Sequence, residues 1–483
     1  MKKLAKDFFD SPTLMTWMSY STKALTLFGV LPLVLKRFSP ADVVLWYLFA
    51  TIITMQTLAD FGFRQTFSRI ISYAFGGAKD IGVFNNAKNG DKHSNVTTDS
   101  APNITLLNSV VSTMNYIYLR LTGIIFILMA IFGTWTMYKP VGQSAHVSQA
   151  WYSWVIVLIV SCVSFYGKIY MNFLEGLFKI ALVRRVETFT SLGSILTSIL
   201  VLFFAPTLLN LVIVNQLWVL IVTFRDWYLC RVVDNRFYEQ VSKPLPFDKK
   251  IFTKIWPAAW RSGISGLMSI GLTNATGLVY AQVGTTGAVA GYLLALRIIS
   301  QVRDISMAPF YSKLPLLAML RAKHDMVTLL KVIKRGMLLS HLVYVIGFLC
   351  AGLLLGPLLK VIKSDVQFVD PKLWLLLGIA FFIHRFGAMH MQVYLSTNHV
   401  ISHIADGISG IIYIAVSIAL IKYVGIYAVP FGMLAGYLGF YAWYAAKYSY
   451  SSLNVSFWNF EKKALLIPML VLSLYVILMF FFK

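Results

Sequence analysis

Residues 106–133 read LLNSVVSTMNYIYLRLTGIIFILMAIFG, a stretch long enough to cross a lipid bilayer as a single helix. Arg120 lies near the middle of this otherwise apolar run. A basic side chain at that depth costs about 2.5–3.5 kcal/mol on insertion scales. Such residues usually face the interior of a helix bundle or a water-filled cavity. The stretch therefore predicts a membrane protein with a polar interior.

The remainder of the chain has the same character. Hydrophobic residues make up 58% of the 483 and charged residues 13%, about half the charge of a typical soluble domain. We expect an all-α polytopic membrane protein, because a backbone within lipid must satisfy its own hydrogen bonds. Hydropathy predicts about 13 transmembrane helices, near residues 13–35, 42–61, 106–133, 151–174, 187–206, 210–230, 257–282, 288–311, 337–359, 373–395, 404–423, 426–446 and 464–482.

The net charge of +23 is distributed unevenly along the chain. Basic residues concentrate in the connections at 231–254 and 313–335, which the positive-inside rule places in the cytoplasm together with the N-terminus and the polar loop 76–105. This distribution accounts for the positive charge without a nucleic-acid partner. No connection is long enough for a folded catalytic domain, so we do not expect an enzyme.

The most charged connection contains Pro244 and Pro246 and has the character of a linker. The cytoplasmic ends of the second and eighth predicted spans have weakly similar sequences, Phe67-Ser68-Arg69 and Tyr311-Ser312-Lys313. This similarity is consistent with two lobes related by a pseudo-twofold axis normal to the membrane. We predict a six-helix lobe at 1–230, a cytoplasmic linker at 231–256, a second six-helix lobe at 257–447, and a loop with an additional transmembrane helix at 448–483.

Several basic residues lie within predicted spans and are candidates for binding an anionic substrate. The central ones have no obvious acidic partner at the same depth, and several continue stripes of Ser and Thr at helical spacing. The candidates for a cationic cavity between the lobes are Lys23, Arg64, Arg120, Arg261, Arg297 and Arg385. Structural ion pairs are the alternative for the central cations. Arg64 and Arg261 lie nearer the cytoplasmic ends, where the alternative is that the side chain snorkels to the interface. Arg225 and Arg303 each adjoin an aspartate and are interpreted as interfacial anchors or local pairs.

Carboxylates within spans are candidates for carrying a coupling proton or binding sodium. They are Asp60, Glu175, Asp304 and Asp406. Asp304 has the alternative role of neutralising Arg303, whereas Asp406 has no adjacent base and is the preferred coupling candidate. A histidine cluster, in which His399 and His403 have the spacing of a helical metal site, is interpreted as interfacial because no cysteine or carboxylate completes a ligand set nearby. No Gly-rich phosphate loop is present, and we expect no cofactor and no metal.

The order and spacing of several segments are similar to those of polysaccharide flippases. This family, which includes the Wzx-type O-antigen flippases, belongs to the multidrug/oligosaccharidyl-lipid/polysaccharide exporter superfamily. The likeness covers about residues 10–450, and a thirteenth span departs from the twelve-helix core of the superfamily. The likeness to polysaccharide flippases rests on LPLVLKRF at 31–38, WYLF at 46–49, LADFGFR at 58–64, APF at 308–310 followed by LP at 314–315, and RAKHD at 321–325.

The resemblance implies a pair of lobes that alternates access and carries an undecaprenyl-diphosphate-linked oligosaccharide outward across a bacterial inner membrane. Its partners would be this lipid-linked substrate, membrane lipids, and a polysaccharide polymerase with a chain-length regulator. The alternatives are a flippase for lipid II or another polyprenyl lipid, a multidrug exporter, and a membrane-embedded polymerase or acyltransferase using His384 or His390. The exporter is disfavoured because a site for organic cations should be acidic.

Overall fold

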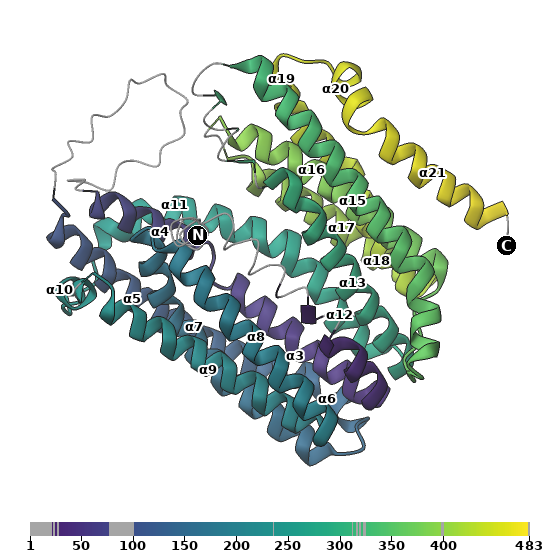
Figure 1. Ribbon diagram of the computed structural model, residues 1–483, viewed down its shortest axis with the longest axis horizontal. Helices are drawn as coiled ribbons and strands as arrows, with labels where there is room; N and C mark the ends of the chain where they lie inside the picture. The colour runs from purple at the N-terminus through teal and green to yellow at the C-terminus, as the bar shows by residue number, and fades with distance from the viewer. Residues whose placement is uncertain are drawn as a thin grey trace, which may run out of the picture. The chain divides into compact units, whose positions relative to one another are not determined.

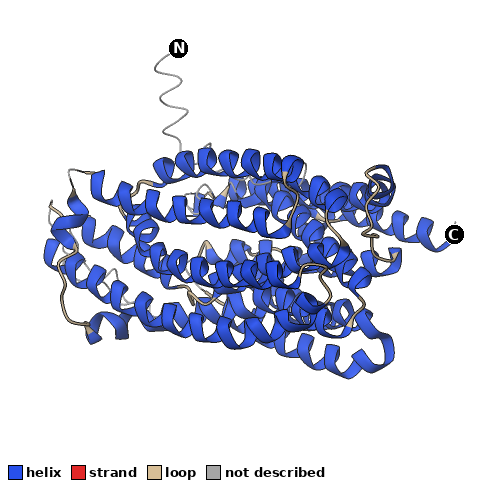
Figure 2. Cartoon of the chain, turned by 90° about the horizontal axis from the view of Figure 1, so that it is seen from below, coloured by secondary structure: helices blue, strands red, loops and turns tan. Residues whose placement is uncertain are grey.

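A computed structural model of the chain describes residues 22, 25–26, 29–76, 101–234, 236–311, 313–314, 317, 320–321, 325–397 and 400–481. These residues are nearly all helical, and Figure 2 shows helices joined by loops without a strand in the described part. Every predicted span after the first coincides with one or more helices. The first, residues 13–35, lies mostly outside the described residues, as does the loop 76–105. The all-α prediction is confirmed.

Within the described ranges, seven helical stretches are long and apolar enough to cross a membrane: Ile104–Gly142, Val147–Gly176, Ile180–Phe204, Leu208–Val232, Met326–Val361, Pro371–Leu395 and Ser402–Leu453. Two shorter apolar helices lie at Pro40–Gln56 and Leu466–Ile477. Large apolar side chains such as Leu119, Phe132 and Leu353 are exposed on these stretches. Contiguous exposed apolar surface is unfavourable in water and favourable in lipid, so the chain is a multi-pass membrane protein.

The chain forms two compact units, and the first comprises Met1–Gly266 with Ala281–Thr286. Within it α7 packs along α9, α4 and α5, and α8 packs on α9. Figure 1 shows these helices in purple to teal. Its helices are α3 (Pro40–Leu58), α4 (Phe63–Phe75), α5 (Ile104–Leu128), η1 (Met129–Gly133), α6 (Thr134–Gly142), α7 (Val147–Gly176), α8 (Ile180–Phe204), α9 (Leu208–Val232), α10 (Phe237–Val241) and α11 (Lys249–Gly266).

The second unit comprises Leu267–Tyr280 and Gly287–Lys483. In this unit α16 packs on α19 and α15, and α17 packs on α18. The boundary between the units falls within the seventh predicted span. Its helices are η2 (Leu267–Gly271), α12 (Leu272–Val283), α13 (Thr286–Tyr311), α15 (Met326–Val361), α16 (Pro371–Leu395), α17 (Ser402–Val424), η3 (Gly425–Tyr427), α18 (Ala428–Gly436), η4 (Tyr437–Tyr441), α19 (Ala442–Leu453), α20 (Phe457–Ala464) and α21 (Leu466–Phe481).

Glycine allows close helix packing in both units. A Cβ built on Gly167 of α7 would lie 2.3 Å from the Thr223 side chain of α9, and one on Gly378 of α16 would lie 2.1 Å from the Phe348 ring of α15. Small residues at such contacts are typical of membrane helices, which associate through close packing.

The C-terminal segment is part of the second unit. The predicted loop and helix at 448–483 contain α20 before α21, and both pack against α15. On α20, Phe460, Glu461 and Ala464 are buried, whereas Trp458 is 78% exposed. The short helix therefore docks one face on the unit, and Phe460 joins an apolar cluster with Leu329, Ile333 and Met389 among others.

Candidate substrate and coupling sites

Arg64 belongs to an ion-pair network in the first unit. Its Nη2 donates to Glu175 Oε1 at 2.7 Å and its Nε to Oε2 at 3.3 Å, a two-point arrangement that favours an arginine–carboxylate pair. Arg184 Nη2 lies 3.7 Å from the same Glu175 oxygen and also pairs with Glu187. The structure therefore joins a substrate candidate, Arg64, with a coupling candidate, Glu175. The sequence analysis did not predict this internal ion pair for Arg64.

Asp60 lies in the turn between α3 and α4 and is buried. Its Oδ2 accepts from the backbone N–H of Arg64 at 2.9 Å, and its Oδ1 accepts from the Tyr118 hydroxyl in a short hydrogen bond. Asn172 Nδ2 donates to the same Tyr118 oxygen at 2.8 Å. This network links α4, α5 and α7, and the role of Tyr118 was not predicted from the sequence.

The remaining basic candidates of the first unit differ in their surroundings. Arg120 is exposed on α5, with its guanidinium 5.3 Å from the Tyr116 ring centroid. Arg261 on α11 is partly buried beside the Trp260 ring at 5.9 Å. Lys23 lies outside the described residues. In the described part of the chain no carboxylate forms an ion pair with Arg120.

In the second unit, Arg297 is an exposed residue in a stretch of α13 whose neighbouring residues are buried. Residues 291–296, 298 and 299 are buried, whereas Arg297 itself is exposed. No described side chain forms a hydrogen bond or an ion pair with it. Six residues later, Arg303 Nε donates to Asp304 Oδ1 at 2.8 Å, and Arg225 in the first unit donates to Asp226 in the same way. The local pairs predicted for these two arginines are confirmed, and Arg297 remains a free cation of the described structure.

The carboxylate of Asp406 lies on α17 and is 5% exposed. Ser409 and Tyr413, which share its helical stripe, are also buried. The polar stripe thus faces the interior of the second unit, whereas Asp304, with a side chain 56% exposed, does not.

Arg385 differs from the expectation of a side chain lining an aqueous cavity, because it is 0% exposed. It contacts Ser306 of α13 and His341 of α15, so it links three helices within the second unit. The sequence identified Arg385 because an arginine in an apolar span is conspicuous. It could not show that the guanidinium points into the packed interior, away from an open cavity.

The histidine interpretation requires a correction for His390. This side chain is fully buried, and its Nε2 lies 3.1 Å from Glu461 Oε1, which also accepts from the Tyr450 hydroxyl at 2.7 Å. The interfacial interpretation is wrong for this buried histidine, and Glu461, 71 residues away in the sequence, lies beside it. Among the described residues this contact does not complete a set of three metal ligands. His384 instead packs against the rings of Tyr437 and Tyr441, and His399 is outside the described residues.

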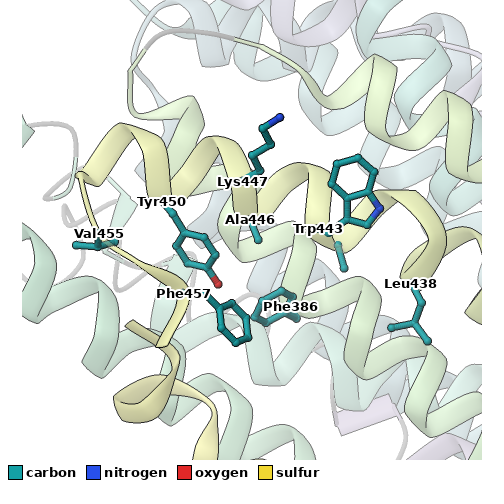
Figure 3. A pocket seen from close by; sticks show the side chains of 9 residues that line it. Phe386, Leu438, Trp443, Ala446, Lys447, Tyr450, Val455 and Phe457 are labelled. Carbon is teal, nitrogen blue, oxygen red and sulfur yellow. The ribbon is translucent and has the colours of Figure 1, made fainter. Parts of the chain in front are cut away.

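A pocket of about 520 Å³ lies beside Tyr450, which contacts Glu461 in the buried network of His390. Figure 3 shows aromatic side chains around it, with the Lys447 ammonium at one side and the Tyr450 hydroxyl turned toward Phe386 and Phe457. It is lined by Phe386, Leu438, Ala442, Trp443, Ala446, Lys447, Tyr450, Val455 and Phe457. The pocket is mainly apolar, and it touches the buried network through Tyr450.

Several solved structures share this architecture. An inward-facing multidrug resistance MATE family transporter of the MOP superfamily matches with a TM-score of 0.66 and 13% identity over 92% of this chain and 94% of that one. An outward-facing structure of such a transporter gives 0.60, with 12% identity over 92% and 94%. A mutant of the Vibrio cholerae MATE transporter VcmN gives 0.57, with 13% identity over 93% and 98%. This chain has the MATE transporter fold.

The other comparisons are negative. No protein-family model matches the sequence. No curated protein matches it either. At 12–13% identity the solved structures establish the fold, and the substrate has to be argued from the side chains of this chain.

Proposed function

We propose that the chain is a flippase that moves an undecaprenyl-diphosphate-linked oligosaccharide from the cytoplasmic to the outer leaflet of a bacterial inner membrane. The N-terminus would lie in the cytoplasm. Alternating access is supported by the fold, since similar structures include both inward-facing and outward-facing transporters. The choice of substrate follows from the charges of the side chains that are exposed or paired.

One observation carries this choice of substrate. Arg120, in the candidate span Ile104–Gly142, and Arg297, in the predicted span 288–311, are exposed cations and have no acidic partner among the described side chains. The carboxylates of Glu175, Asp226 and Asp304 are each engaged by an arginine. Placing an arginine within a membrane span costs free energy unless its side chain faces water or an anion. The surplus of available charge is therefore positive, which suits a diphosphate.

Guanidinium groups match phosphate oxygens in bidentate geometry. Each charge-assisted contact contributes about 1.5–3 kcal/mol, and few contacts are needed because a site that binds too tightly would retain its substrate. Asp406 is the proposed coupling residue for a proton or sodium gradient, since it is buried on a polar stripe of α17. The Asp406→Asn change should therefore weaken the response of transport to an imposed gradient.

Export of a cationic drug is the second candidate function. It is favoured by the fold, because the similar solved structures include transporters described as multidrug resistance proteins. It is disfavoured by Asp60 and Glu175, whose oxygens already accept hydrogen bonds within the first unit. A lipid II flippase would use the same cationic chemistry and differs only in the glycan.

A charge series at Arg297 tests the proposal in cells that depend on the chain for surface glycan. Arg297→Gln should reduce binding ten- to hundredfold, because it removes one charge-assisted contact. Arg297→Lys should retain part of the export, and Arg297→Glu should abolish it. Lys249→Gln and Lys249→Glu, at an exposed residue of α11, form the matched control and should leave export unchanged. Normal export by a well-expressed Arg297→Glu protein would contradict the proposal.

A further inference from the structure

The pocket beside Tyr450 has walls that hydrogen bonds and ring contacts hold in place. Tyr450 of α19 donates to Glu461 Oε1 of α20 at 2.7 Å, and its ring packs edge-to-face with Phe457 at 6.0 Å between centroids. On α16, the Phe386 ring packs against His390, whose Nε2 lies 3.1 Å from the same Glu461 oxygen. Three helices therefore meet around one buried carboxylate, and the pocket between them is preformed.

The lining of this pocket is apolar apart from one cation. Phe386, Leu438, Trp443 and Phe457 supply apolar surface, and among the described residues that line the pocket Lys447 alone is charged. Figure 3 shows the Lys447 ammonium directed away from the rings of Phe386 and Phe457. A ligand that matches this lining has an apolar chain and an anionic group. That combination is the chemistry of an anionic lipid.

The position of Lys447 in the chain gives the direction of such a lipid. The predicted span 426–446 ends just before Lys447, which places its ammonium at the membrane surface, where lipid phosphates lie. Leu438, which also lines the pocket, is nine residues earlier in the same span, about 13 Å deeper along a helix. Trp443 and Phe457 are exposed, so the pocket opens at the apolar outer surface of the unit. The lining thus runs from the level of the headgroups to that of the acyl chains.

We propose that this pocket binds an anionic phospholipid, with an acyl chain between α16, α19 and α20 and the phosphate beside Lys447. The lipid contacts all three helices and therefore stabilises the docking of α20 on the second unit. A zwitterionic phospholipid offers the same chains without a net negative charge, so the site prefers an anionic headgroup. The proposal does not depend on the identity of the transported molecule.

The test is a lipid titration of the purified, delipidated full-length protein in detergent. Thermal unfolding midpoints are measured while phosphatidylglycerol or phosphatidylcholine with identical acyl chains is added. Phosphatidylglycerol should raise the midpoint in a saturable way at a concentration about fivefold lower than phosphatidylcholine, because one interfacial lysine favours an anionic headgroup by about this factor. Glycerol 3-phosphate, which offers the headgroup without a chain, should have no effect.

Two variants separate a specific site from general contact with lipid. Lys447→Gln, at an exposed position, should remove the preference for phosphatidylglycerol. Lys422→Gln removes the same charge from an exposed residue of α17 in the same unit and, as the matched control, should keep the preference. Phosphatidylglycerol with brominated chains should quench the fluorescence of Trp443 at the concentrations that raise the midpoint, so Trp443→Phe should reduce the quenching.

Three results would overturn the proposal. The first is an equal response to the two phospholipids, or a preference that survives in Lys447→Gln. The second is quenching that is unchanged in Trp443→Phe. The third is tighter binding of a polyprenyl phosphate than of phosphatidylglycerol, which would assign the pocket to the lipid part of a transported substrate instead of a membrane phospholipid.

Discussion

At the scale of single residues, arginines that look alike in the sequence occupy three different environments. Arg64 is paired with Glu175, Arg385 is enclosed by aromatic and polar side chains, and Arg297 is exposed without a partner among the residues that the structure describes. Only the third environment leaves the charge available to a substrate. The depth of a basic residue in a span therefore indicates that it has a role, and its partners determine which role that is.

The Arg64–Glu175 pair should contribute to stability and not to substrate affinity. The Arg64 side chain is 36% exposed and that of Glu175 13%, so solvent screening limits the coupling energy to about 1 kcal/mol. A double-mutant cycle with Arg64→Gln and Glu175→Gln, read by unfolding in detergent, should give this value. Lys179, which pairs with Asp234 at the surface, provides the control pair and should show less coupling. A coupling free energy near zero for Arg64–Glu175 would contradict a stabilising role for this pair.

Sequence patterns predicted the helices better than they predicted these partners. A span is a local property, because about 20 consecutive apolar residues are sufficient to define it. The contact between Arg64 and Glu175 joins positions 111 residues apart, and that between His390 and Glu461 joins positions 71 apart. Nothing local in the sequence encodes such pairings. The adjacent pair of Arg303 with Asp304, by contrast, could be predicted from the sequence alone.

At the scale of the elements, helix ends are held by specific caps. Asp370 begins α16: its Oδ1 accepts from the backbone N–H of Lys372 at 2.8 Å and from the Tyr427 hydroxyl at 2.9 Å. Partial burial opposes ionisation, but these hydrogen bonds outweigh it and hold the Asp370 pKa below its usual value of 3.8. The cap thus connects α16 with η3 within the second unit.

This cap predicts a defined pH dependence. Because the pKa of Asp370 is lower in the folded state, its charge-dependent stabilisation is present above pH 3.8 and is lost as the pH falls through the folded pKa. Asp370→Ala should destabilise the protein by about 1 kcal/mol at pH 7, as for other N-caps. The difference from wild type should shrink below pH 3.8. Unfolding midpoints of both proteins between pH 7 and about pH 3 measure this, and a constant difference would contradict it.

The short helix α20 should be an integral part of the second unit. Phe460 is 0% exposed against the cluster formed with α15 and α16. Its replacement by alanine should cost about 3 kcal/mol through lost burial and the cavity that remains. Trp458 on the same helix is 78% exposed, and Trp458→Ala should change stability by less than about 0.5 kcal/mol. Equal effects of the two changes on unfolding would show that α20 is not docked in this way.

At the scale of the whole molecule, the fold is that of a transporter and the available charge is positive. Similar folds are found in proteins described as multidrug transporters, so the fold by itself does not select a substrate. The difference lies in the exposed cations Arg120, on α5, and Arg297, on α13, and in acids that are engaged by internal partners. The sign of the charge available to a substrate therefore distinguishes a flippase for an anionic lipid from an exporter of organic cations.

The most direct measurement uses the purified protein in liposomes with two substrates offered in parallel. One is a polyprenyl-diphosphate-linked oligosaccharide, whose exposure on each leaflet is followed with an impermeant glycan-modifying enzyme, and the other is a fluorescent organic cation. We predict protein-dependent movement of the glycolipid between leaflets, its loss in Arg297→Glu, and no accumulation of the cation under a proton or sodium gradient. Gradient-driven accumulation of the cation without movement of the glycolipid would contradict the account.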